Sequence, residues 1–111
     1  VTAPDRQDRP WTASHPVTIA DPDSGRRCLY VNRLYTRAIE AVPAAVSRRL
    51  LERLFRRLEQ PEFQLRWRWR PGDLALWDNH RCQHYAVADY YPQQRRMLRV
   101  TVAGPAPAAA S

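Results

Sequence analysis

Apolar and polar side chains alternate without a break from Glu62 to Arg70. Every second position there is large and apolar, namely Phe63, Leu65, Trp67 and Trp69. Successive side chains of a β-strand point to opposite faces of a sheet, so the segment is predicted to be a strand with one apolar face. We expect Trp67 and Trp69 to face the core and the arginines between them to face solvent.

Further short runs with strand character occur on both sides of this segment. Two of them, Val17–Ile19 and Cys28–Asn32, flank a turn at Asp21–Gly25 and predict a hairpin. Three others follow the turn at residues 71–73 and are also predicted to be strands: Leu74–Trp77, Gln83–Ala88 and Arg95–Ala103.

An amphipathic helix is predicted over about residues 43–60. Its apolar residues recur with the spacing of one helical face: Val46, Leu50, Leu51, Leu54, Phe55 and Leu58. Its arginines lie largely on the other side: Arg48, Arg49, Arg53, Arg56 and Arg57. One helix among many short strands favours a mainly β fold, a sandwich or jelly roll with a helical insertion.

The 111 residues predict a single small domain. Residues 1–14 are polar and carry proline, which predicts an extended lead-in, and residues 105–111 are of low complexity, which predicts a flexible tail. No apolar run is long enough for a membrane-spanning helix, and no leader is seen. Two cysteines, Cys28 and Cys82, are too few for a disulfide framework, so we expect a reducing cytoplasm and buried thiols.

His84 is the candidate functional histidine. Small residues share its strand face, leaving open space around the imidazole. Arg95 and Arg99 share one face of the next predicted strand, about 13 Å apart at ~3.3 Å per residue. Buried arginines need anions to pair with, so the three side chains are candidates for one anion-binding cavity. Spacing alone leaves open that this face is simply solvated.

Long motifs then resemble a known family. Residues 77–104, WDNHRCQHYAVADYYPQQRRMLRVTVAG, resemble the C-terminal signature of the TauD/TfdA (taurine dioxygenase) family of Fe(II)/2-oxoglutarate-dependent dioxygenases. Residues 15–39, HPVTIADPDSGRRCLYVNRLYTRAI, and residues 61–79 continue the match. The resemblance implies that residues 15–104 are the C-terminal portion of such a domain, part of a double-stranded β-helix (jelly roll).

The resemblance also implies roles for four residues. His84 in QHYA is implied to be a metal ligand, and Arg95 to bind the distal carboxylate of 2-oxoglutarate. Arg99 is implied to bind a small anionic substrate such as a sulfonate or sulfate ester, and Tyr35 to line the substrate pocket. The planar fork of an arginine matches two oxygens of such anions. No catalytic residue is implied beyond the metal site.

The resemblance is incomplete at the metal. Iron sites of this class use two histidines and one carboxylate, and the first histidine comes as H-x-D or H-x-E. None of His15, His80 and His84 stands in such a motif. We therefore expect a truncated or split chain, completed by an N-terminal chain or by a homo-oligomer. Alone, a partial jelly roll leaves sheet edges uncovered, and we expect it to be poorly soluble, oligomeric or partly molten.

A basic nucleic-acid-binding module is the alternative. The net charge of +7, the arginines of the helix and the RWRWR run of residues 66–70 are typical of phosphate contact with base stacking. Inward tryptophans with solvated arginines account for the same pattern, and we favour that interpretation.

Overall fold

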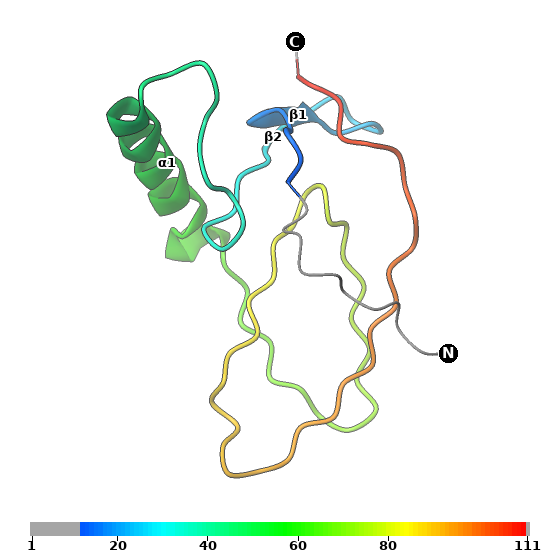
Figure 1. Ribbon diagram of the computed structural model, residues 1–111. Helices are drawn as coiled ribbons and strands as arrows, with labels where there is room; N and C mark the ends of the chain where they lie inside the picture. The colour runs from blue at the N-terminus through cyan, green and yellow to red at the C-terminus, as the bar shows by residue number, and fades with distance from the viewer. Residues whose placement is uncertain (1–11, 111) are drawn as a thin grey trace.

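The computed structural model describes residues 12–110. Its regular elements are β1 (Thr18–Ala20), β2 (Arg27–Leu29), α1 (Ala44–Leu58) and the 3₁₀ turn η1 (Pro61–Phe63). Figure 1 shows the helix to one side of the hairpin, with the following residues running in long loops before the chain returns to the hairpin.

The predicted hairpin is confirmed. β1 and β2 pair in antiparallel fashion with Ile19 opposite Cys28. The turn between them closes where the Gly25 N–H donates to the Asp21 carbonyl at 2.8 Å. Gly25 has a φ of 67°, a conformation that glycine adopts without the steric penalty of a Cβ atom.

The C-terminal residues lie along the other edge of β1. Ile19 forms a β-bridge with Ala109, the Ala20 N–H donates to the Ala108 carbonyl at 3.1 Å, and the Ala110 N–H donates to the Thr18 carbonyl at 3.1 Å. Figure 1 shows this last part of the chain passing the hairpin. Ile19 therefore has backbone on both sides, and it is 1% exposed.

The predicted helix is confirmed over Ala44–Leu58, within residues 43–60. It buries Leu51 and Phe55 against Val31, which follows β2. Four partly buried apolar residues surround this cluster: Val17, Ile39, Leu54 and Leu58. The helix therefore packs against the chain that leaves the hairpin, and the two together form a small apolar core.

The four strands predicted after the helix are not formed in the part of the chain that the structure describes: Glu62–Arg70, Leu74–Trp77, Gln83–Ala88 and Arg95–Ala103. Alternation decides which side chains share a face, but a strand also needs a neighbouring backbone to bond with. These runs find no such neighbour among residues 12–110. Trp67 is 57% exposed, so the prediction that it faces a core is wrong here. The described residues thus show one helix and a two-stranded sheet, and the jelly roll stays a prediction.

Candidate functional site

Arg81 connects the WDNHRCQH segment, residues 77–84, to the hairpin turn through ion pairs. Its Nη2 lies 2.7 Å from Asp21 Oδ1 and 3.2 Å from Asp23 Oδ2, and its Nε lies 3.3 Å from Asp78 Oδ2. Asp21 is 2% exposed. The Ser24 hydroxyl, the Asp23 N–H and Arg81 donate to this carboxylate and lower its pKa to about 2, although burial acts in the opposite direction.

Gln83 is a second attachment of the same segment. Its Nε2 donates to the Val31 carbonyl at 2.6 Å, and its Oε1 accepts from Asn32 Nδ2 at 3.2 Å. Arg81 and Gln83 thus both reach the hairpin and the chain that leaves it. Cys82 between them is exposed and Cys28 is only half-buried, so the expectation of two buried thiols is wrong. The side chains on either side of Cys82, Arg81 and Gln83, are the ones that contact the hairpin and the chain after it.

His84 and Arg95 each lie beside an aromatic ring from a nearby position in the chain. The His84 imidazole is exposed, and its centroid is 5.2 Å from that of Trp77, with 44° between the planes. The Arg95 guanidinium carbon lies 5.5 Å from the centroid of the Tyr90 ring. Arg95 therefore makes a cation–π contact while its side chain stays exposed to solvent.

The other two predicted site residues lie on the surface. Tyr35 is 77% exposed, and Arg99 is exposed as well. Among the described residues, no hydrogen bond, ion pair or ring contact joins His84, Arg95, Arg99 and Tyr35 to one another. Their convergence on one cavity stays a prediction.

The donors present do not form an iron site by themselves. In residues 12–110, no three His, Cys, Asp or Glu side chains gather closely enough to hold a metal ion. His84 offers one imidazole, whereas non-haem Fe(II) sites of this class use two histidines and a carboxylate. Two further ligands would have to come from outside the described residues.

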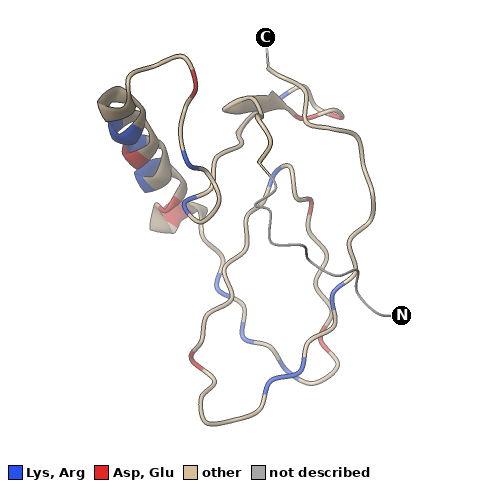
Figure 2. Cartoon of the chain, viewed as in Figure 1, with Lys and Arg blue, Asp and Glu red and all other residues tan. Residues whose placement is uncertain are grey.

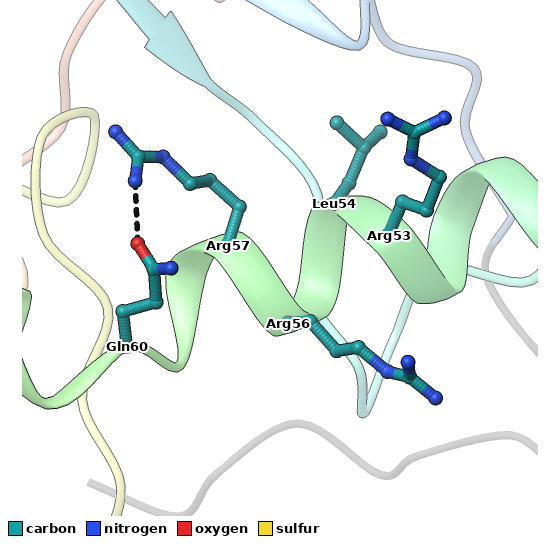
Figure 3. Close-up of a pocket in the computed structure, with 5 residues that line it drawn as sticks. All are labelled: Arg53, Leu54, Arg56, Arg57 and Gln60. Carbon is teal, nitrogen blue, oxygen red and sulfur yellow. Dashed lines mark hydrogen bonds between the residues drawn. The ribbon is translucent and has the colours of Figure 1, made fainter.

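An open depression of about 420 Å³ lies on α1, apart from these residues (Figure 3). Its lining is three arginines, one leucine and Gln60, and none of the predicted site residues belongs to it. Arg57 donates to Gln60 Oε1 across it. Figure 2 shows basic residues along the helix and along the loops that follow.

The exposed Trp67 bears on the nucleic-acid alternative. Its indole is held within the chain by the hydrogen bond that Trp67 Nε1 donates to Asp73 Oδ2 at 3.2 Å. Arg66 beside it pairs with Asp89 at 2.7 Å. Two groups of the RWRWR run therefore already have partners within the chain. The structure offers no specific observation that favours this alternative.

Arg81 and Gln83 were not singled out in the sequence. The sequence does show two acidic residues in the turn at residues 21–25 and an arginine, Arg81, shortly after Asp78-Asn79. No local pattern, however, predicts that two segments so distant in the chain are in contact. No helix in residues 12–110 has the length and apolar character needed to cross a membrane.

Comparison with known proteins gives the family. The family model described as "Taurine catabolism dioxygenase TauD, TfdA family" matches residues 2–101. An alkylsulfatase of Acinetobacter baylyi is 36% identical over 85% of this chain and 29% of its own length. An alpha-ketoglutarate-dependent sulfate ester dioxygenase of Pseudomonas putida is 40% identical over 87% and 32%, respectively. An alpha-ketoglutarate-dependent sulfonate dioxygenase of Saccharomyces cerevisiae is 38% identical over 83% and 23%.

The chain thus spans between 23% and 32% of the length of these relatives. No solved structure matches it. The family match, in contrast, extends over nearly the whole chain and includes the segments that carry Tyr35, His84, Arg95 and Arg99. The chain belongs to the TauD/TfdA family of dioxygenases.

Proposed function

We propose that this chain is the C-terminal portion of an Fe(II)/2-oxoglutarate-dependent dioxygenase that oxidises a small anionic substrate, such as a sulfonate or a sulfate ester. The observation that carries the proposal is the family match over residues 2–101. The names of the relatives from Pseudomonas putida and Saccharomyces cerevisiae support the substrate class. The fold proposed for the complete domain is the jelly roll.

Each predicted site residue has one role in this proposal. His84 supplies one of three iron ligands, and Arg95 pairs with the distal carboxylate of 2-oxoglutarate. Arg99 pairs with the anionic group of the substrate, and Tyr35 lines the substrate pocket. Both arginines offer the paired N–H donors that carboxylates and sulfonates accept. Their exposure in this chain leaves both guanidinium groups accessible to such anions.

We further propose that the iron site is completed from outside the chain, either by an N-terminal chain that bears the H-x-D half or by a further ligand that a second copy supplies in a homo-oligomer. Large apolar side chains support this proposal, since Leu74, Leu76 and Val100 are 91%, 92% and 90% exposed. Large apolar side chains that are this exposed gain free energy when a partner removes them from water. The partner would cover it and supply the neighbouring strands. A reducing cytoplasm suits the free Cys28 and Cys82.

The test is reconstitution. The chain is co-expressed with the N-terminal portion of the Pseudomonas putida relative, and succinate formation from 2-oxoglutarate is measured with Fe(II) and a panel of sulfonates and sulfate esters. We expect turnover only in the mixture. Absence of turnover, despite a co-purifying complex, would contradict the proposed activity. Turnover by the chain alone would contradict the need for a partner.

Three variants test the roles of His84, Arg95 and Arg99 within that mixture, and a fourth is their control. His84→Ala is expected to abolish turnover, Arg95→Ala to raise the KM for 2-oxoglutarate, and Arg99→Ala to raise the KM for the anionic substrate. The matched control is Arg96→Ala, which removes an exposed arginine of the same segment that has no proposed role. An Arg96→Ala enzyme as impaired as Arg95→Ala would show that general charge, and not a specific contact, is being measured.

A further inference from the structure

The carboxylate of Asp21 is buried in the hairpin turn, and Arg81 is the cation that neutralises it. Within residues 12–110, no other arginine or histidine forms an ion pair with Asp21. A charge taken out of water is unfavourable unless it is paired and hydrogen-bonded. Asp21 meets both conditions only when Arg81, 60 residues further along the chain, lies at the turn.

This pairing also determines where the His84 segment lies. Arg81 is three residues before His84, and Gln83 is directly before it. Gln83 donates to the Val31 carbonyl at 2.6 Å. Both of these side-chain attachments therefore precede His84 in the sequence. A ring contact of His80 with Tyr30, at 6.4 Å between centroids, also joins the segment to this part of the chain, but only the Arg81 attachment involves a buried charge. Loss of Arg81 would therefore remove the strongest restraint on the segment.

We propose that Arg81 is a positioning residue: by neutralising the buried Asp21, it holds residues 77–84 on the hairpin and orients the His84 imidazole beside Trp77. Arg81 touches neither the imidazole nor any proposed anion, so it acts through the backbone of its segment. The importance of orienting His84 rests on the proposed function, in which this imidazole is an iron ligand.

A second arginine–aspartate pair provides the matched control. Arg66 Nη2 lies 2.7 Å from Asp89 Oδ2, the same distance as that from Arg81 Nη2 to Asp21 Oδ1. The side chains of Arg66 and Asp89, however, are 67% and 62% exposed. Exposed pairs of this kind contribute little to stability. Arg66→Ala removes the same guanidinium chemistry with no buried charge left behind, so it reports the effect of losing an arginine as such.

The experiment records the ring Cε1–H signal of His84 by NMR in the full chain, with His84→Asn to assign it and Trp77→Leu to mark its position without the indole. We expect Arg81→Ala to move the signal to its Trp77→Leu position, while Arg66→Ala leaves it unchanged. Arg81→Lys is expected to restore it partly, because an ammonium is a single point of charge, whereas the guanidinium is a fork. The Phe55 ring signals report the helix core and are expected to keep their positions.

Three results would overturn the proposal. They are an unchanged His84 signal in Arg81→Ala, equal shifts of His84 and Phe55, and a wild-type signal already at the Trp77→Leu position. If Arg81→Ala unfolds the chain, Asp21→Asn/Arg81→Ala removes the buried charge and its partner together. The His84 signal is again expected at the Trp77→Leu position in this folded variant, and retention of the wild-type position overturns the proposal. The measurement uses no metal or co-substrate, so its outcome is independent of the reconstitution assay.

Discussion

Ile19 and Ala109 pair across a β-bridge, although almost the whole chain separates them. The bridge places residues 108–110 beside β1 as a third strand-like segment, and Ile19, which it pairs, is the most deeply buried residue of the hairpin. Residues that are unremarkable in sequence thus contribute to stability by closing one edge of the small sheet.

Removing the N–H that Ala110 donates to Thr18 is expected to destabilise the hairpin. Ala110→Pro eliminates this donor and should lower the free energy of unfolding by about 1 kcal/mol, the typical contribution of one hydrogen bond. Urea unfolding followed by far-UV circular dichroism measures it. Ala106→Pro, between Pro105 and Pro107, is the control and should leave the midpoint unchanged. Equal midpoints for both variants would show that this pairing does not contribute to stability in solution.

Truncation of Phe55 is expected to remove the helix from its core. The ring is buried against Val31 and Leu51, and a Phe→Ala change at such a site costs about 3–5 kcal/mol. In a chain this small, that loss should abolish most helical circular dichroism. Leu50→Ala on the same helix is the control because Leu50 is 38% exposed. A Phe55→Ala chain with full helicity would mean that the helix does not depend on this packing.

Acid is expected to loosen the hairpin turn through Asp21. Folding lowers the pKa of this carboxyl from 3.8 to about 2, so its contribution to stability is fully present above pH 3.8 and is lost as the pH falls toward 2. Asp21→Asn should lower the unfolding midpoint at neutral pH and remove part of the acid dependence in that window. Arg33 also lowers the pKa of Glu52 and Glu59, so some acid dependence should remain. The measurement is a series of urea midpoints between pH 7 and pH 2. Parallel curves for the wild type and Asp21→Asn would exclude this role.

Arg33 is expected to attach the loop after β2 to α1 by charge and by stacking. It lies 3.0 Å from Glu52 Oε2 and 2.6 Å from Glu59 Oε1, with its guanidinium carbon 4.9 Å from the Phe55 ring centroid. Arg33→Gln should lower the Tm modestly at low salt. The difference from wild type should shrink as ionic strength rises, because these side chains are partly exposed and screened. Arg53→Gln, on the exposed side of the same helix, is the control. A salt-independent difference would assign the effect to packing on Phe55 alone.

The isolated chain is expected to self-associate. Apolar side chains of residues 63–102 are largely exposed, with Leu65, Tyr85 and Val102 between 85% and 87%. Sedimentation velocity across a concentration series should show oligomers, and a dye that binds apolar surface should fluoresce strongly. The complex formed with the complementing N-terminal portion should sediment as a single species with less dye binding. A monomer with a sharp cooperative thermal transition would contradict this expectation.

The period-two and helical patterns predicted local structure well where the partner residues are close in sequence. The hairpin at β1 and β2 forms because its turn needs only the residues between Asp21 and Gly25. Helix α1 forms for a related reason: its backbone bonds are internal, and its apolar side packs on the chain just before it. The strands predicted after Gln60 do not form among residues 12–110, because alternation selects the side chains that share a face but does not by itself provide a paired backbone.

In the candidate site, too, some features could be predicted from the sequence and others could not. Motif and residue type predict His84, Arg95, Arg99 and Tyr35 as site residues, because the chemistry of a ligand is carried by single side chains and their order along the chain. Only the tertiary structure disclosed the contact of Arg81 with Asp21 and the pairing of Ala109 with Ile19. The reason is physical: side-chain chemistry and local periodicity are properties of the sequence, whereas the partner of a buried charge or a strand edge is selected by the packing of the whole chain.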